Sequence, residues 1–282
     1  MEKVRIVIDS TTDLSEKIKD KLTVVPLTVR FGEEEYIDGI TMTHKDFYEK
    51  LTESDVIPAT SQPTPEAFSK VFREITENGE KCVVLTLSSH LSGTFQSACI
   101  AASDHPGSVY VVDGRSVAIG TGILAELALN MSEEGKTAEE IVSSLEKERE
   151  NVRVIAMLDT LEYLKRGGRI SKTVAFAGGI LSIKPVVSIS DGEIIVLGKA
   201  RGSRQGNDLL VKEIGNLGGV DLDKPFLLGY TGVNDELLRK FIETASSLWE
   251  ERGVPAQSVP VGSVVGTHAG PGAVAAAFFK KN

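Results

Sequence analysis

Short runs rich in Val and Ile alternate with helical patterns along this sequence, and that alternation restricts its fold more than any other feature. Strand-like runs are predicted at 4–10, 23–31, 81–87 and 108–114, and helices at 13–22, 43–54, 64–79, 93–103, 117–131 and 137–151. Such an order is typical of parallel strands with helices on both faces. The first half therefore predicts an α/β domain with a mainly parallel sheet.

Capping residues support the helix assignments. Thr64 stands at a helix start with Pro65 at the first helical position, and Gly79 follows the helix end. Thr43 is a candidate N-cap of the preceding helix, and Thr137 with Glu140 forms a capping-box pattern. These signals fix where three helices should begin.

The pattern changes near residue 150. A strand-then-helix unit at 152–164 is followed by strand-like runs at 183–189 and 193–201, joined by an Asp191–Gly192 hairpin signal. Further predictions are a strand at 223–232, a long helix at 234–253 that ends at Gly253, and a small-residue helix after Pro271 and Gly272. We therefore expect two α/β domains, 1–150 and 151–282, the second built on a mixed sheet, with a ligand in the cleft between them.

Composition excludes several classes of protein. With 282 residues and 41% hydrophobic content, the chain can bury a sizeable core. Its net charge of -9 argues against nucleic acid or a membrane surface as a partner, since both are anionic. Two cysteines provide no disulfide framework. The N-terminus lacks a signal-peptide pattern and no apolar run is long enough to span a bilayer. We expect a cytoplasmic protein without stable membrane insertion.

Small hydroxyl residues crowd the stretch LSSHLSGTFQSA at 87–98, where a buried strand ends and a helix begins. Ser92 and Gly93 lie at the expected helix start, where free N–H groups and the helix dipole favour an anion. Comparable groups occur at Thr60 and Ser61, at Thr267 and His268, and at 9–12. Helix capping explains each one singly, whereas four of them together favour an anion site.

Basic residues and glycines mark two further regions. His268 lies among Gly266, Gly270 and Gly272, which would let backbone approach a ligand closely. The segments KRGGRISK and GKARGSR include Arg169 and Arg201 and suit either a phosphate-bearing ligand, an acidic partner or a merely solvated basic face. The apolar run at 174–183 fits a pocket wall or a core helix. No nucleotide-binding, nucleophile-elbow or metal-ligand motif is present, so no catalytic residue, metal or cofactor is expected.

Seven motifs in this order resemble the DegV family: DSTTDL, TSQPTP, SSHLSGTFQSA, LKRGGRIS, IKPVVSISDGEI, KARGSR and GTHAGPGA. The resemblance covers essentially the whole chain. The family includes the fatty-acid-binding subunits (FakB) of bacterial fatty acid kinase. It implies a two-domain α/β protein that buries one long-chain fatty acid and presents its carboxylate to a separate ATP-dependent kinase subunit. The kinase makes an acyl-phosphate that serves phospholipid synthesis.

The resemblance also implies roles for particular residues. The carboxylate would be held by Thr60 or Ser61, by Ser92 with Gly93, and by Thr267 and His268. Arg169 and Arg201 would lie at the mouth, facing the acyl-phosphate or the kinase. Two alternatives remain open: a stand-alone phosphotransferase or hydrolase that uses His268, and a lipid sensor whose basic segment contacts another protein.

Overall fold

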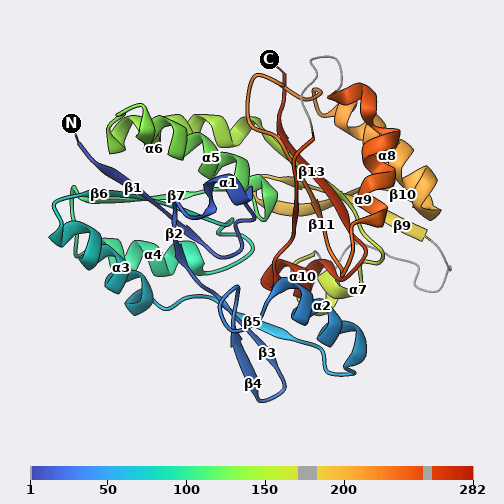
Figure 1. The fold of residues 1–282 in the computed structure, drawn as a ribbon, viewed down its shortest axis with the longest axis horizontal. Coiled ribbons are helices and arrows are strands. Elements are labelled where there is room, and N and C mark those ends of the chain that lie inside the picture. The colour runs from blue at the N-terminus through green and yellow to red at the C-terminus, as the bar shows by residue number, and fades with distance from the viewer. Residues whose placement is uncertain (1, 171–182, 250–255, 282) are drawn as a thin grey trace.

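The computed structural model of the chain describes residues 2–170, 183–249 and 256–281. A four-stranded sheet in the first half has the order β2-β1-β6-β7, and all its pairs are parallel (Figure 1). Its strands are β1 (Val4–Asp9), β2 (Thr23–Val25), β6 (Lys81–Thr86) and β7 (Val109–Asp113). The prediction of a parallel sheet is confirmed.

Helices cover both faces of this sheet, as the alternation predicts. Val7 of β1 packs with α3 (Pro65–Glu77) and α4 (Thr94–Ala102). Ile6 and Ile8 point the other way, toward α5 (Ile119–Glu133) and α6 (Ala138–Glu148). Successive strand residues face opposite sides, and Ile6, Val7 and Ile8 are all apolar because both faces of β1 are buried there.

The second half forms a six-stranded mixed sheet in the order β10-β9-β8-β13-β11-β12. Its strands are β8 (Val152–Met157), β9 (Ile183–Ser190), β10 (Glu193–Arg201), β11 (Leu227–Tyr230), β12 (Ser258–Pro260) and β13 (Val274–Phe279). Asp191 and Gly192 both have positive φ, at 49° and 81°, in the turn between antiparallel β9 and β10. This is the hairpin that the Asp-Gly pair predicts. The sheet packs against α8 (Gly202–Asn216) and α9 (Glu236–Thr244).

Helix α5 lies between the two sheets and contacts strands of both. Glycines allow this close packing: a Cβ on Gly122 would lie 2.0 Å from the Asp13 carbonyl oxygen, and one on Gly120 would lie 2.3 Å from the Val154 side chain. The small apolar residues of α5 therefore join the two halves of the chain. Because the parallel sheet precedes residue 150 and the mixed sheet follows it, we propose a domain boundary there.

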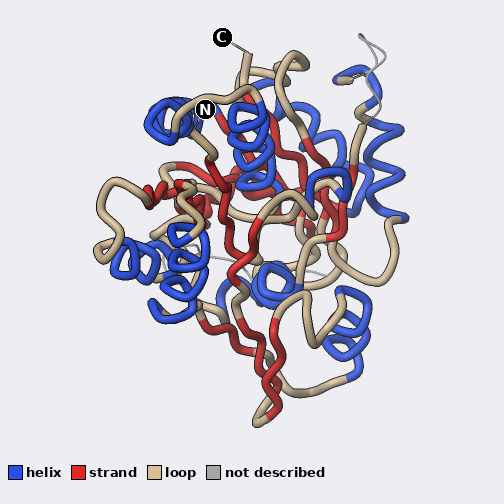
Figure 2. Tube along the Cα trace, turned by 60° about the vertical axis from the view of Figure 1, so that its left-hand side comes forward, coloured by secondary structure: helices blue, strands red, loops and turns tan. Residues whose placement is uncertain are grey.

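A three-stranded sheet, β4-β3-β5, extends away from the main body beside α2 (His44–Glu53) and α10 (Ser263–Ala269), as Figure 2 also shows. It consists of β3 (Thr28–Phe31), β4 (Glu34–Ile37) and β5 (Ala59–Ser61). Phe31, Phe47 and Tyr48 pack there with Val264 of α10. This sheet from the first half thus contacts a helix from the end of the chain.

Three predicted caps are confirmed. The hydroxyls of Thr43, Thr64 and Thr137 accept the N–H of the residue three positions on, and Thr43 and Thr137 complete capping boxes. Within the described ranges, no helix is long and apolar enough to cross a membrane.

One strand prediction and one helix prediction need correction. The run at 23–31 is two strands in different sheets, because Pro26 lacks the N–H that a continuous strand would use. The small-residue helix predicted after Gly272 is strand β13, in the middle of the mixed sheet between β8 and β11. Its alanines fit between two neighbouring strands, and this tertiary packing overrides their helix propensity.

Two predicted helices are shorter in the structure. Helix α1 (Glu16–Lys19) is one turn long because Asp13 and the residues after it are held in a buried loop. Helix α9 ends at Thr244, and a 3₁₀ turn (Ser246–Leu248) places Trp249 against Phe241. Gly253 and most of the apolar run at 174–183 lie outside the described residues.

Candidate ligand-binding site

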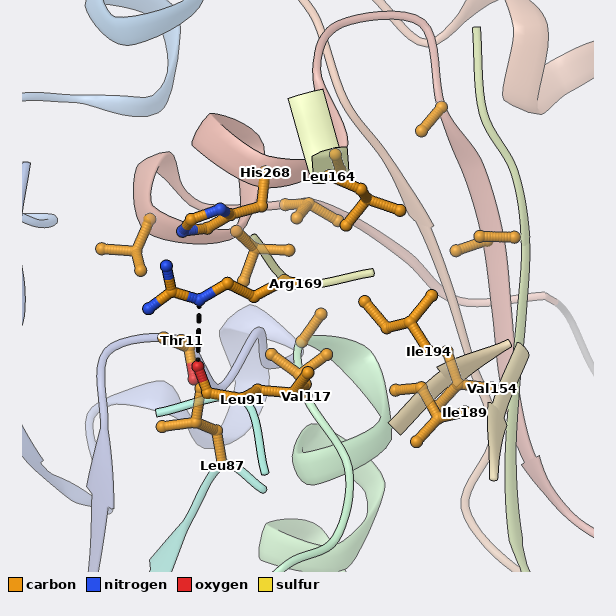
Figure 3. A pocket seen from close by; sticks show the side chains of 18 of the residues that line it. Thr11, Leu87, Leu91, Val117, Val154, Leu164, Arg169, Ile189, Ile194 and His268 are labelled. Atoms are coloured by element: carbon orange, nitrogen blue, oxygen red, sulfur yellow. Dashed lines mark hydrogen bonds between the residues drawn. The ribbon is translucent and has the colours of Figure 1, made fainter. Parts of the chain in front are cut away.

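A cavity of about 410 Å³ lies between the two halves of the chain and has mainly apolar walls (Figure 3). Its lining comes from the loops after β1, β6 and β7, from β5, from the mixed sheet and from α10. The apolar residues include Leu27, Leu87, Leu91, Val117, Ile119, Val154, Leu158, Leu164, Val187, Ile189, Ile194, Val261 and Val264. In Figure 3, Arg169 and His268 lie toward one end of the cavity and Val154, Ile189 and Ile194 toward the other.

A hydroxyl–imidazole contact forms part of the polar end. Thr60 Oγ1, on β5, lies 3.0 Å from His268 Nε2, on α10. His268 Nδ1 is buried and bonds to no group among the described residues. An unsatisfied buried donor is costly, so the neutral tautomer with its hydrogen on Nε2 fits this setting. His268 then donates to Thr60, and the Thr60 hydroxyl hydrogen is left to donate to a ligand.

Burial keeps His268 neutral at pH 7. Loss of solvation, followed by the positive charge of Arg169, lowers the pKa of His268 to about 4. The imidazole packs directly on Gly167, where a Cβ would lie 2.1 Å from Nδ1. The ring therefore packs directly against the Gly167 backbone, where any side chain would displace it.

Arg169 supplies positive charge beside His268. Its Nε donates to the Leu91 carbonyl at 3.2 Å, and another guanidinium nitrogen donates to the Gly167 carbonyl at 2.6 Å. In the described part of the chain, no carboxylate forms an ion pair with it. A guanidinium that bonds only carbonyls keeps its full charge for an anion in the cavity.

Ser92 lines the cavity just before α4. Its Oγ accepts the Thr94 N–H at 3.3 Å and lies 2.9 Å from Thr94 Oγ1. When Thr94 donates both hydrogens, the Ser92 hydroxyl can donate to a ligand. The neighbouring Gly93 is in close contact with Gln62, since a Cβ there would lie 2.3 Å from Gln62 Oε1. Glycine at 93 thus lets the loop approach β5.

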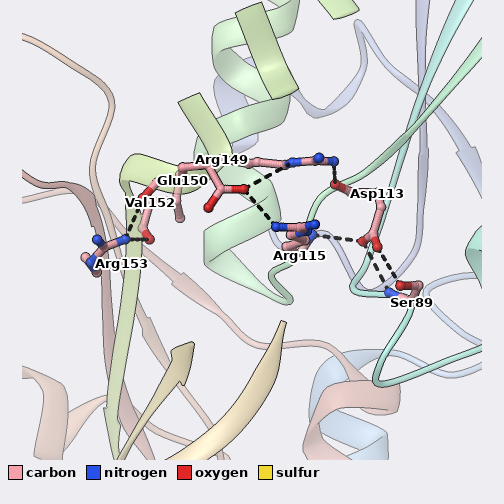
Figure 4. Close-up of polar contacts among 7 residues, drawn as sticks. All are labelled: Ser89, Asp113, Arg115, Arg149, Glu150, Val152 and Arg153. Carbon is pink, nitrogen blue, oxygen red and sulfur yellow. Dashed lines mark hydrogen bonds and ion pairs between the residues drawn. The ribbon is translucent and has the colours of Figure 1, made fainter. Parts of the chain in front are cut away.

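Hydrogen bonds from several directions fix the loop that carries Ser92. The Leu87 N–H donates to Asp9 Oδ2 at 2.7 Å, and Ser88 Oγ donates to the Gly192 carbonyl in the second half at 2.8 Å. Asp113 accepts both the N–H and the hydroxyl of Ser89, as Figure 4 shows. The loop is therefore held before any ligand arrives.

The structure brings together five of the eight residues predicted for the site: Thr60, Ser61, Ser92, Arg169 and His268 line the cavity. Gly93, Thr267 and Arg201 do not line it. Thr267 belongs to α10 and not to a strand end, and its hydroxyl donates to the Ser263 carbonyl within the helix. Arg201 ends β10 and is exposed.

Four further polar residues line the cavity: Thr11, Gln62, Ser188 and Thr231. Thr11 donates to Asp9 and Ser188 to the Val154 carbonyl, so neither hydroxyl hydrogen is available to a ligand. Gln62 directly follows Thr60 and Ser61, and this adjacency was a usable signal. Nothing in the local sequence marks Ser188 or Thr231, which reach the cavity only through the mixed sheet.

The described residues contain no group of three or more His, Cys, Asp or Glu side chains arranged to hold a metal ion. The polar end instead offers neutral donors and one guanidinium. This set suits a carboxylate, which needs several hydrogen bonds when it leaves water.

Comparison with known proteins agrees with this architecture over nearly the full length of the chain. The model for uncharacterised proteins of the DegV family matches residues 3–281. The chain belongs to the DegV family. A DegV domain-containing protein of Caldanaerobacter subterraneus subsp. tengcongensis is 35% identical over 286 residues, covering all of both chains.

Solved DegV structures share the fold. A structure that describes fatty acid binding by a DegV family protein of Thermus thermophilus has a TM-score of 0.87 and 33% identity, covering 98% of this chain and 99% of the other. A stearic acid-binding protein of Eubacterium ventriosum has a TM-score of 0.85 and 29% identity, covering 99% of each chain. The α/β fold predicted from the sequence, with a parallel sheet followed by a mixed sheet, is thus that of the family.

Proposed function

We propose that this DegV protein binds one long-chain fatty acid, with the carboxylate at the polar end of the cavity and the acyl chain along the apolar walls. The observation that carries this proposal is the division of one interdomain cavity into an end with Thr60, Ser92, Arg169 and His268 and a remainder lined by aliphatic side chains. The fatty-acid-binding DegV family protein of Thermus thermophilus and the stearic acid-binding protein of Eubacterium ventriosum support the same ligand class.

The two parts of the cavity contribute differently to binding. Burying about 14 methylenes at ~0.8 kcal/mol each gives roughly 11 kcal/mol before ordering costs. A single neutral hydrogen bond to the carboxylate contributes about 1–3 kcal/mol when its loss leaves a buried group unpaired. The acyl chain therefore supplies most of the affinity, and the hydroxyls set the position of the carboxylate.

We further propose that a separate ATP-dependent kinase subunit phosphorylates the bound acid. A carboxylate oxygen would attack the γ-phosphorus of ATP, an acyl-phosphate would form and ADP would leave. The neutral donors Thr60 and Ser92 would hydrogen-bond the carboxylate without removing its charge, and the Arg169 guanidinium would offset the charge of the acyl-phosphate that forms. Ser61 and Gln62 are exposed and also line the cavity, so its polar end lies near the surface where a kinase could reach. Arg201, exposed at the end of β10, is proposed as a kinase contact.

The geometry does not favour His268 as a nucleophile in a stand-alone phosphotransferase. Its Nε2 contacts Thr60, and its Nδ1 is buried against Gly167. Neither ring nitrogen is open to attack phosphorus without movement of α10 or of the Gly167 backbone.

ATP radiolabelled at the γ-phosphate separates carrier from enzyme. The isolated, fatty-acid-loaded protein should give no labelled protein or lipid, and addition of the fatty acid kinase subunit of the same organism should give labelled acyl-phosphate. Label on protein or lipid without the kinase would contradict the carrier proposal. A loaded protein that gives no label with an active kinase would contradict the kinase step alone.

A further inference from the structure

Helix α10 carries His268 to the cavity but does not cap its own N-terminus. Its N-cap residue is Gly262, which has no side chain to accept the free N–H groups of the first turn. Those N–H groups must find acceptors elsewhere in the chain. A short helix depends strongly on such contacts, because its own hydrogen bonds are few.

Two buried carboxylates from the first half of the chain supply the acceptors. Asp13 Oδ1 accepts the Gly262 N–H at 2.8 Å, and Asp38 Oδ1 accepts the Ser263 N–H at 3.3 Å. Asp13 is 8% exposed and Asp38 is 5% exposed. Negative charge at this position is also favoured by the helix dipole. Both loops therefore hold the start of α10 from outside the helix.

Asp38 also connects α10 to the strand system that carries Thr60. Its Oδ2 accepts the Ser10 hydroxyl at 2.8 Å, and Ser10 Oγ accepts the Leu27 N–H at 3.0 Å. Leu27 immediately precedes β3, in which Val29 pairs with Thr60 of β5. The Asp38 carboxylate is thus bonded directly to α10, which carries His268, and through Ser10 to the residue before β3, the strand that pairs with Thr60.

Buried polar groups surround Asp13 and Asp38 at the start of α10. Tyr48 of α2 is buried and donates to the Val261 carbonyl, just before α10. Burial raises the pKa of Asp13 and that of Asp38, while the Gly262 and Ser263 N–H groups and the Ser10 hydroxyl lower them. Asp9 is also nearby, and its carboxylate accepts from Thr11 and Leu87. Each of the two capping carboxylates therefore has its own donors at the α10 start.

We propose that Asp38, assisted by Asp13, is a positioning residue that sets where His268 meets Thr60 at the carboxylate end of the cavity. His268 lies five positions after Ser263, which corresponds to ~7.5 Å along the helix. A shift or tilt of the α10 start would therefore move the imidazole relative to Thr60. This inference rests on the proposed function for its biological meaning, but its structural content can be tested without a ligand.

The first test is a titration of His268 by NMR in ligand-free protein. Replacing Asp38 by Asn keeps the shape of the side chain and removes the charge that caps α10. We expect the pKa of His268 to rise from about 4 toward 6.5 as the loosened ring gains water. The signal of His268 is identified by its loss in His268→Gln. Glu126→Gln, a half-buried carboxylate on α5, serves as the matched control and should leave the titration unchanged.

The second test is a double-mutant cycle on stearate affinity. Asp38→Asn should weaken binding about tenfold, and the same change should have little further effect once Thr60→Ala has removed the contact that Asp38 positions. Should Asp38→Asn fail to fold, Ser10→Ala removes the side-chain link from Asp38 to the Leu27 N–H, while the Asp38 N–H still donates to the Leu27 carbonyl and both capping carboxylates stay in place. The changes in titration and affinity should then have the same direction and a smaller size.

Two results would overturn the inference. One is an unchanged His268 titration in a folded Asp38→Asn or Ser10→Ala protein. The other is strictly additive losses in the double-mutant cycle. If the wild-type protein bound no stearate, the proposed function would fail, while the ligand-free titration would still decide whether Asp38 positions His268.

Discussion

At the residue scale, the polar end of the cavity depends on a few hydroxyls whose hydrogens are not used elsewhere. Thr60 accepts from His268 and can donate to a ligand, whereas the Thr11 and Ser188 hydroxyls already donate to protein groups. The same residue type therefore plays different roles on one cavity wall. The distinction follows from each hydroxyl's partners and not from its proximity to the cavity.

Removal of single hydroxyls provides the first prediction. Thr60→Ala and Ser92→Ala should each weaken stearate binding by about 1–3 kcal/mol, or roughly 5- to 160-fold in Kd, and should reduce acyl-phosphate formation further. Fatty acid should still be retained, because the acyl chain supplies most of the affinity. Isothermal titration with stearate measures the loss. Ser103→Ala, an exposed hydroxyl at the end of α4, is the control. Acyl-phosphate formation at the wild-type rate in Ser92→Ala would refute its assignment.

The sequence was a good guide to residues at the ends of strands and a poor one to residues placed by long-range contacts. Ser92 and Thr60 were predicted because small hydroxyls lie at expected strand–helix junctions, and the resemblance to the DegV family implies their carboxylate-binding roles. Thr267 was predicted for the same reason, but its position within α10 turns its hydroxyl to the helix backbone. The acceptors at the start of α10 lie 225 and 249 positions away in the chain, so no local pattern reveals them.

At the scale of single elements, the end of α7 (Glu162–Arg166) determines how closely backbone approaches His268. Two adjacent glycines there have different reasons to be glycine. Gly167 has an ordinary helical φ of -70°, but a Cβ would collide with the imidazole. Gly168 has a φ of +69° and no atom within 4 Å of a Cβ position.

This contrast gives the second prediction. Gly167→Ala should displace His268 and weaken stearate binding about tenfold or more while costing little backbone energy. Gly168→Ala should lower the free energy of unfolding by about 1 kcal/mol, because its φ is unfavourable for alanine, with little effect on binding. Urea unfolding and stearate titration of both variants measure the two effects. Equal affinities for Gly167→Ala and wild type would show that the imidazole position is unimportant.

Sequence patterns predicted elements well where local signals agree with tertiary packing. The capped helices α2, α3 and α6 and the Asp191–Gly192 hairpin have local causes and appear as predicted. Strand β13 does not, since its alanines favour a helix and its place between β8 and β11 requires a strand. Pro26 was a visible signal for the break between β2 and β3, but not for the change of sheet.

At the scale of the whole molecule, helix α5 packs between the parallel sheet and the mixed sheet, and the cavity lies between the two halves of the chain. The buried carboxylates Asp13 and Asp38 of the first half bond to α10 of the second half. Alternation of strands and helices predicted the parallel sheet, and the hairpin predicted a mixed one. The three-stranded sheet could not be foreseen, because β3 pairs with β5 across α2. Its contact with α10 joins chain segments more than 200 residues apart.

The third prediction concerns stability and pH. Burial lowers the pKa of His268 to about 4 from an ordinary value of 6.5, so between these values the unfolded chain binds more protons at this residue than the folded protein does. The His268 contribution to stability is therefore present above pH 6.5 and is lost as pH falls toward 4. The raised pKa values of Asp9, Asp13 and Asp38 act in the opposite direction, favouring the folded state as pH falls.

A variant isolates the histidine contribution from that of the carboxylates. The slope of unfolding free energy against pH between 4 and 6.5 should be smaller in His268→Gln than in wild type, by at most about 1.4 kcal/mol per pH unit. Urea unfolding at half-unit pH steps measures both slopes. Identical slopes would show that His268 titrates normally in the folded protein.

Mass spectrometry of the organic-solvent extract of purified, untagged protein tests the central claim most directly. The proposed function predicts one long-chain fatty acid per chain, retained through purification because its acyl chain is buried. If the protein proves empty, added stearate should bind with one-to-one stoichiometry. A protein that is empty and also takes up no added long-chain fatty acid would contradict the account.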